Sequence, residues 1–121
     1  MVLGVAPATL ARVVEHLLRP RVGFTIVEKL DDASGLVPAA SRQRPHTVVT
    51  NLRFLGRGPA LRIAELRSAV PAARLVLIAP EGRLGEALGY GADTCLNEGD
   101  LVAELLSVLQ EGVPRANGPP D

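Results

Sequence analysis

The sequence predicts a single α/β domain built on a doubly wound parallel sheet. Strand-like apolar runs alternate with helix-periodic segments from the first residue to about Gly112, which is the pattern of βα units in a parallel sheet. A chain of 121 residues with 47% hydrophobic content is also long and apolar enough to bury one core. We therefore expect a folded domain over residues 1–112 and a polar, Pro- and Gly-rich tail or linker over residues 113–121.

The first two strand–helix units precede residue 43. The first strand is "VLGVA" (Val2–Ala6), and a helix with an apolar stripe follows it and stops at a proline. A second strand is expected around Thr25–Val27. The helix after it, about Ala33–Arg42, is less regular because Gly35 and Pro38 both lower helix propensity. The stripe of the first helix consists of Leu10, Val13, Val14, Leu17 and Leu18.

The third and fourth units carry the most apolar strands of the chain. "TVVTNL" (Thr47–Leu52) and "RLVLIA" (Arg74–Ala79) are apolar enough to be central strands that are buried on both faces. After a loop, a helix begins at Pro59, a residue that suits the first helical turn, and ends before Pro71. A short helix, Leu84–Leu88, follows the fourth strand and ends at "GYGAD".

The fifth unit completes the sheet. "TCL" (Thr94–Leu96) is a brief strand, and Asn97 with Asp100 is typical of an N-cap and its third residue. The last helix carries apolar residues on one face from Leu101 to Leu109. Five such units indicate a flavodoxin-like sheet of strand order 2-1-3-4-5, in which function is expected at the carboxyl ends of the strands.

Composition excludes several classes of function. Thirteen basic residues are matched by 13 acidic ones, and two Phe, one Tyr and no Trp offer no platform for stacked bases, so we expect no nucleic-acid surface. The single Cys95 excludes an internal disulfide and a Cys-based zinc site and fits a cytoplasmic location. No apolar run approaches membrane-spanning length. We expect no metal and no cofactor.

Three segments resemble the receiver domains of bacterial response regulators, over nearly the whole chain. They are "RPHTVVTNLRFLGRG", "PAARLVLIAPEG" and "LGYGADTCLNEGDLVAELLSVLQEG", and the last is most similar to receivers attached to helix-turn-helix output domains. The resemblance implies the flavodoxin-like (CheY-like) fold. It also implies a phosphoryl-transfer site, with acids after the first and third strands for magnesium and phosphoryl, a Ser or Thr after the fourth, and a Lys after the fifth.

None of these groups is present at the matching positions. The acid pair falls at Ala6 and Pro7, and the phosphoacceptor aspartate falls at Asn51. The hydroxyl position is Ala79, and the lysine position is Glu98. Hard oxygen ligands for magnesium and cationic donors for a phosphoryl group are therefore missing. The resemblance is to an aspartate-less pseudo-receiver that is not an enzyme, in which Asn51 preserves the geometry of the strand end.

Small shifts of alignment do not restore the site. Moving the register by one places Asn97 at the lysine position, and the only lysine of the chain is Lys29, beside the second strand. The aromatic residue that moves inward in typical receivers is replaced by Cys95. Asp31 and Asp32 are a candidate pair of metal ligands at a displaced site. Two acids before a helix more often interact with the positive end of the helix dipole.

The favoured hypothesis is a phosphorylation-independent interaction domain of a two-component-type or transcriptional regulator. By resemblance, its partner is another protein or a second copy, bound through the fourth helix, fifth strand and fifth helix. The candidate interface residues are Leu84, Leu88, Tyr90, Asp100, Glu104 and Glu111. The alternative is a small-molecule sensor that uses the vacated pocket near Asn51, Ala79 and Glu98.

One further feature is the basic loop after the third strand. Arg53, Arg57, Arg62 and Arg67 are the nearest approach to a basic patch, and "GRG" (Gly56–Gly58) could cradle an anion. The loop lacks the lysine and the glycine spacing of a phosphate-binding loop. A solvated turn is the simpler interpretation.

Overall fold

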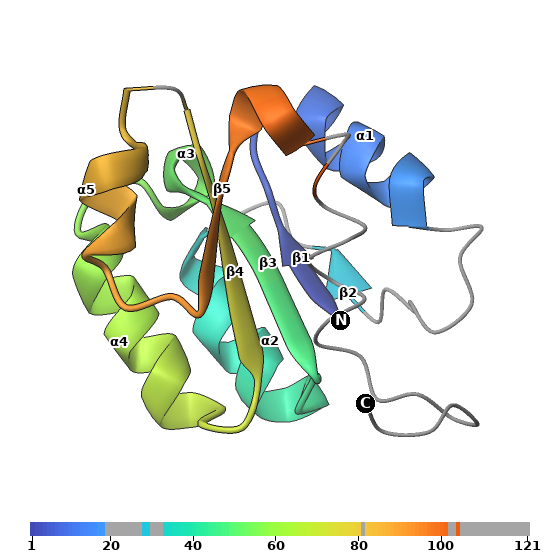
Figure 1. The fold of residues 1–121 in the computed structure, drawn as a ribbon. Helices are drawn as coiled ribbons and strands as arrows, with labels where there is room; N and C mark the ends of the chain where they lie inside the picture. Colours follow the sequence, from blue (N-terminus) through green and yellow to red (C-terminus); the bar gives the residue numbers. More distant parts are fainter. Residues whose placement is uncertain (19–27, 30–32, 81, 102–103, 105–121) are drawn as a thin grey trace, which may run out of the picture.

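The computed structural model describes residues 1–18, 28–29, 33–80, 82–101 and 104. Its centre is a parallel sheet of five strands in the order β2-β1-β3-β4-β5 (Figure 1). This confirms the doubly wound sheet and the strand order predicted from the sequence. The strands are β1 (Val2–Gly4), β2 (Glu28–Lys29), β3 (Thr47–Asn51), β4 (Arg74–Ala79) and β5 (Thr94–Asn97).

Helices cover both faces of this sheet (Figure 1). One apolar cluster joins α1 to one face of the sheet, and a larger cluster joins α2, α3, α4 and α5 to the other face. Among the described residues, no helix combines the length and the apolar content needed to cross a bilayer. The helices are α1 (Ala8–Leu18), α2 (Leu36–Gln43), α3 (Leu52–Leu55), α4 (Pro59–Ala69) and α5 (Leu84–Leu88), with 3-10 turns η1 (Ala33–Gly35) and η2 (Glu98–Asp100).

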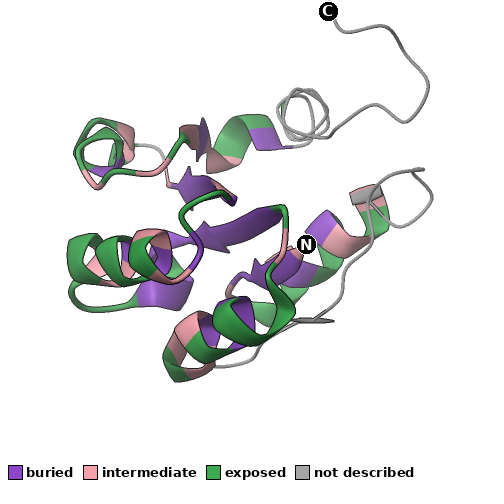
Figure 2. Cartoon of the chain, turned by 90° about the horizontal axis from the view of Figure 1, so that it is seen from below, coloured by how far each residue is buried: buried purple, intermediate pink, exposed green. Residues whose placement is uncertain are grey.

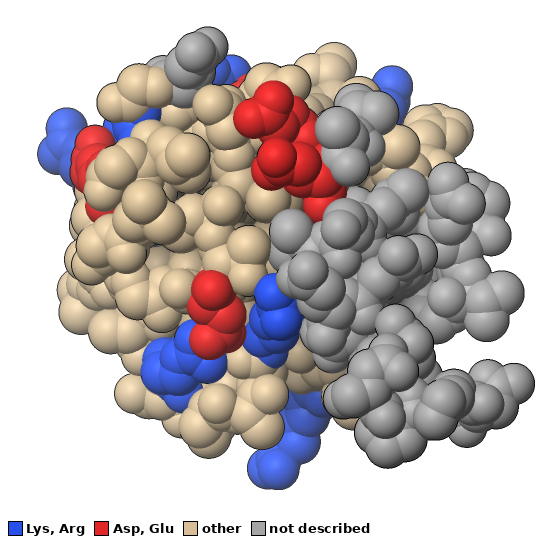
Figure 3. Space-filling view, viewed as in Figure 1, with Lys and Arg blue, Asp and Glu red and all other residues tan. Residues whose placement is uncertain are grey.

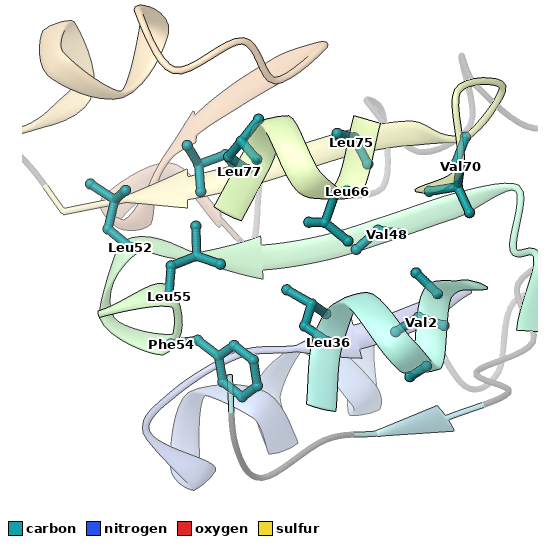
Figure 4. Packing of buried hydrophobic residues seen from close by; sticks show 14 of the residues in the cluster. Val2, Leu36, Val48, Leu52, Phe54, Leu55, Leu66, Val70, Leu75 and Leu77 are labelled. Atoms are coloured by element: carbon teal, nitrogen blue, oxygen red, sulfur yellow. The ribbon is translucent and has the colours of Figure 1, made fainter. Parts of the chain in front are cut away.

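The two central strands are buried on both faces, as predicted (Figure 2). Val48 of β3 and Leu75 of β4 pack into the larger cluster, while Val49 and Val76 pack into the smaller one. Figure 4 shows the larger cluster between β3, β4 and the helices above them. Because side chains alternate along a strand, these two strands support both layers of the fold.

The structure corrects the predicted bounds of the first and third strands. β1 ends at Gly4, two residues early. Thr25–Val27 lies outside the described residues, and the observed pairing of β2 with β1 is at Glu28–Lys29. β3 stops at Asn51, and Leu52 begins the short helix α3 where we expected strand and then loop. The reason is local, since the Asn51 side chain caps α3.

The predicted helices need smaller corrections. α2 starts at Leu36, after η1, because Gly35 is its N-cap and Pro38 lies in the first turn, where an intrahelical N–H is not required. In α1, Val13 was predicted in the core stripe but is 41% exposed. It lies at the edge of the face that buries Ala11 and Val14.

The end of the chain is only partly covered. The Asn97 side chain accepts a hydrogen bond from the Gly99 N–H (2.9 Å), which confirms Asn97 as a cap, here of η2. Leu101 is buried, as the predicted apolar face of the last helix requires. Residues 102–103 and 105–121 lie outside the described part, and with them the predicted domain boundary at 112 and Glu111.

The turn before β5 is fixed by one aspartate. Asp93 donates its N–H to the Leu75 carbonyl (3.0 Å) and accepts from the Leu75 N–H through Oδ2 (2.7 Å). Arg67 Nη2 lies 2.8 Å from the same oxygen. Burial raises the pKa of Asp93, but the Leu75 amide and the Arg67 guanidinium outweigh burial and lower that pKa from its ordinary value. The "GAD" segment thus attaches β5 to β4 and α4.

Gly4 makes room for the one buried aromatic residue of the described chain. A Cβ on Gly4 would lie 2.7 Å from Phe54 Cε2 and 3.1 Å from Leu36 Cδ1. Phe54 is 7% exposed and belongs to the larger cluster (Figure 4). The absence of a side chain at Gly4 therefore sets how closely α3 approaches β1.

We predict that Gly4→Ala destabilises the fold by about 1–3 kcal/mol, because the added methyl group overpacks the contact with Phe54. Urea unfolding followed by circular dichroism measures this change. Gly85→Ala is the matched control, since nothing lies within 4 Å of a Cβ at this position in α5. The control should be more stable than the wild type by about 0.5–1 kcal/mol. Equal midpoints for Gly4→Ala and the wild type would contradict the prediction.

Candidate functional site

The carboxyl ends of four strands meet at one edge of the sheet. Parallel pairing places Gly4 beside Thr50 and Ala79 beside Asn97, so the ends of β1, β3, β4 and β5 lie along the same edge. The positions that resemble a phosphorylation site are thus brought together there. They are Ala6 (half-buried), Pro7 (exposed), Asn51 (2% exposed), Ala79 (0% exposed) and Glu98 (half-buried).

The centre of this edge is the Asn51 side chain, which bonds to two segments. Its Nδ2 donates to the Ala6 carbonyl (2.6 Å), and its Oδ1 accepts from the Ala6 N–H (3.1 Å). Oδ1 also accepts from the Phe54 N–H (3.0 Å), which is the N-cap bond of α3. One amide group therefore ties the end of β1 to the end of β3 and starts the following helix.

These contacts require an amide and not a carboxylate. A buried polar group must be paired, and an amide offers both a donor and an acceptor, whereas an ionised carboxylate only accepts. A carboxylate at Asn51 would keep the bonds from Ala6 N and Phe54 N but would face the Ala6 carbonyl oxygen at the place of the donor. Asn51 is therefore matched to a structural role by its chemistry.

The hydroxyl position at the end of β4 is occupied by a buried methyl group. Ala79 is 0% exposed and packs in the larger cluster. Together with the burial of Asn51, this leaves neither residue with accessible surface for a ligand. The small-molecule sensor, the alternative drawn from the sequence, gains no support from this geometry.

Cys95 lies in β5 at the position where typical receivers carry an aromatic residue. Its Sγ donates to the Ala87 carbonyl of α5 (3.5 Å), and the side chain is partly buried. Burial raises the pKa of the Cys95 thiol, which disfavours the thiolate. The residue acts as a small packing group that links β5 to α5.

The lysine position carries negative charge. Glu98 begins η2, and Asp100 and Glu104 are exposed close to it in the sequence. Figure 3 shows acidic side chains gathered over this end of the molecule. Lys29 lies in β2, at the opposite edge of the sheet from β5. An anionic phosphoryl group would meet repulsion at this end of β5.

No metal site is found in the part of the chain that the structure covers. Among the described residues, no three His, Cys, Asp or Glu side chains lie close enough together to hold an ion. Asp31 and Asp32, the candidate displaced pair, lie outside the described residues.

The described part of the candidate interface lies on α5 and the turn after it. Leu88 is 64% exposed, and Leu84 and Tyr90 are half-buried. The Glu86 carboxylate accepts from Arg83 Nη2 (2.9 Å) and from the Tyr90 hydroxyl. These two hydrogen bonds lower the pKa of Glu86 to about 2, and the bond from Arg83 has the larger effect. Sequence reasoning did not select Arg83 and Glu86, although their spacing of three residues suits such a pair.

Solved structures with the same architecture are receiver domains. The signal receiver domain of NarL from Mycobacterium tuberculosis is 20% identical, with a TM-score of 0.77 over 91% of each chain. A LuxR-family two-component response regulator from Aurantimonas sp. SI85-9A1 is 21% identical, with a TM-score of 0.78 over 91% of this chain and 81% of that chain. The response regulator domain of Thermotoga maritima CheB is 17% identical, with a TM-score of 0.75 over 98% and 97%.

No protein-family model and no curated protein matches the sequence. At these identities the structural likeness establishes the fold. The chain thus has the receiver fold, a flavodoxin-like parallel sheet covered by helices on both faces.

We predict that Asn51→Asp destabilises the fold at neutral pH by about 1–3 kcal/mol, because the Ala6 carbonyl loses its donor and faces a charge. Burial and this carbonyl should raise the pKa of the new carboxyl group in the folded state. When the pKa of an acid is higher in the folded state than in the unfolded state, its protonated form stabilises the fold at low pH. This stability is lost as the pH rises. The deficit against the wild type should therefore shrink as the pH falls.

Denaturant unfolding of both proteins from about pH 4 to pH 8 measures the effect, since the unperturbed Asp pKa is about 3.9. Asn97→Asp is the control, because Asn97 accepts one bond at an exposed turn and donates none that the fold depends on. A deficit for Asn51→Asp that does not change with pH would contradict the assigned donor role.

Proposed function

We propose that this chain is a phosphorylation-independent, receiver-like signalling module that acts by protein–protein interaction, within a two-component-type or transcriptional regulator. The observation that supports this most strongly is the use of the Asn51 side chain. Its donor and its acceptor are both engaged, and the residue is 2% exposed. A phosphoryl acceptor requires an accessible, nucleophilic oxygen, which this buried amide does not supply.

The surroundings of Asn51 support the same conclusion. Ala6 and Pro7 provide no carboxylate for a divalent ion, and Ala79 provides no hydroxyl for a phosphoryl oxygen. Glu98 adds negative charge where phosphate would need a cation. The module we propose is therefore not an enzyme, needs no cofactor, and presents its surfaces without a phosphorylation step.

The proposed interaction surface is α5 with β5, extended by Asp100 and Glu104. Leu88 offers an exposed apolar side chain, and Tyr90 is held by its bond to Glu86. An exposed leucine beside a half-buried tyrosine that is held in place is suited to an interface core. The partner is another cytoplasmic protein or a second copy of the chain in a homodimer.

An amide NMR titration with magnesium and beryllofluoride, a mimic of the phosphoryl group, tests the inactive site. We expect no saturable shifts at the amides of Asn51, Ala79 and Glu98, because the phosphoacceptor position carries the Asn51 amide and no carboxylate to coordinate beryllium. An authentic phosphorylatable receiver in the same buffer is the positive control. Saturable shifts at these amides would contradict the proposal and point to Asp31 or Asp32.

The homodimer version is tested by light scattering over a dilution series. If the chain self-associates through α5, Leu88→Glu should shift the equilibrium toward monomer by at least about tenfold, since a buried unpaired charge is costly at an interface. Leu61→Glu in α4 is the matched control, because Leu61 is equally exposed on another helix. Monomer alone at every concentration would leave a different protein as the partner.

A further inference from the structure

The most exposed large apolar side chain of the described residues is on α4, away from the proposed α5 surface. Leu61 is 67% exposed. At about 100° per residue, it falls opposite Ile63 and Leu66, which are buried in the core. The neighbouring Ala60 and Ala64 are also exposed. The outer face of α4 therefore carries three exposed apolar residues, next to the exposed Glu65, although the core already uses the other face.

Arginines precede and follow Leu61 in α3, in the loop and in α4. Arg53 in α3 and Arg57 in the loop are exposed, and Arg62 follows Leu61 directly. No Asp or Glu occurs between residues 33 and 64, and the first acid after that, Glu65, lies 3.9 Å from Arg62. The region is thus basic although the whole chain has no net charge.

The loop geometry keeps Arg57 on the surface. Gly56 and Gly58 both have φ of +67°, a conformation that glycine adopts easily, and nothing lies within 4 Å of a Cβ at either position. Gly58 is the N-cap of α4 and provides no side-chain acceptor. The positive end of the helix dipole therefore adds to the charge of the arginines.

We propose that Leu61 with Arg53, Arg57 and Arg62, here called the α4 surface, docks an acidic segment of a partner protein that carries a large apolar residue. The apolar residue of the partner would cover Leu61, and its carboxylates would face the arginines. Charge complementarity of this kind selects partners and speeds association. The loop Gly56–Gly58 and its arginines, which the sequence suggested as an anion site, would then form one side of a protein interface.

A second copy of this chain does not fit the same surface. A two-fold interface places the same patch of both copies face to face. The arginines of one copy would then oppose those of the other, while the one acid described beside them, Glu65, already lies 3.9 Å from Arg62. Like charges brought together disfavour association, so an acidic partner is the better occupant.

This inference does not rest on the proposed function. It uses residues of α3, α4 and the loop between them, whereas the proposed homodimer uses α5 and β5. Binding at the α4 surface would persist if Asn51 proved unimportant, and its failure would leave the inactive strand end as proposed.

Amide NMR titration of the 121-residue chain with a short synthetic peptide tests the inference. The probe contains leucines flanked by glutamates. One control peptide replaces its leucines by serines, and another replaces its glutamates by lysines. We expect saturable shifts at the amides of residues 57–58 and 60–64 with the probe alone. Raising salt from about 50 to about 300 mM should weaken binding at least threefold, because exposed charges are screened.

Variants of the chain assign the contact. Leu61→Ser and Arg57→Glu should each weaken binding of the probe by at least about fivefold, as expected when an apolar anchor or a charge partner is lost. Val13→Ser is the control and should bind as the wild type does, because Val13 is exposed on α1, on the opposite face of the sheet from α4.

Several results would overturn the inference. Equal binding of the serine peptide would mean charge attraction without an apolar contact, and binding of the lysine peptide would exclude an acidic partner. Shifts centred outside residues 57–64, or no saturation, would exclude the α4 surface. Shifts in α4 that depend on protein concentration without any peptide would identify a second copy as the occupant.

Discussion

The edge of the sheet where the strands end depends on one amide side chain that both donates and accepts hydrogen bonds. Asn51 donates to and accepts from the backbone of Ala6, and it also starts α3 through the Phe54 amide. The same turn of helix then directs Phe54 over Gly4, so two contacts between the β1 and β3 segments reinforce each other. Because the bonds are buried, each would be costly to leave unmade.

This arrangement explains how the strand-end edge of the receiver fold is held together with an asparagine at the end of β3. A phosphorylation site needs charged groups that stay accessible, and such groups cost stability when they are packed close together. Here Ala79 fills the end of β4 with a methyl group, and Asn51 replaces charge by a paired amide. At Asn51 and Ala79 this edge is therefore part of the folded core.

Most of the architecture could be predicted from the sequence, because apolar runs such as "TVVTNL" and "RLVLIA" fix the two buried strands. The position of Asn51 at the end of a central strand was also predicted. Its partners could not be, since the bond to Ala6 spans 45 residues and depends on how β1 and β3 are placed. Helix α3 was missed because a single capped turn carries no periodic pattern, and Val13 was misplaced because it lies at the edge of its helix face.

Cys95 gives the molecule an internal reporter. It is the only thiol in the chain, and its Sγ is bonded to the Ala87 carbonyl beneath α5. Partial burial and a raised pKa both slow its reaction with alkylating reagents. Local opening of α5 from β5 should therefore raise the rate at which the unmodified protein is alkylated. A ligand or partner that holds α5 in place should slow that rate without any label having been introduced.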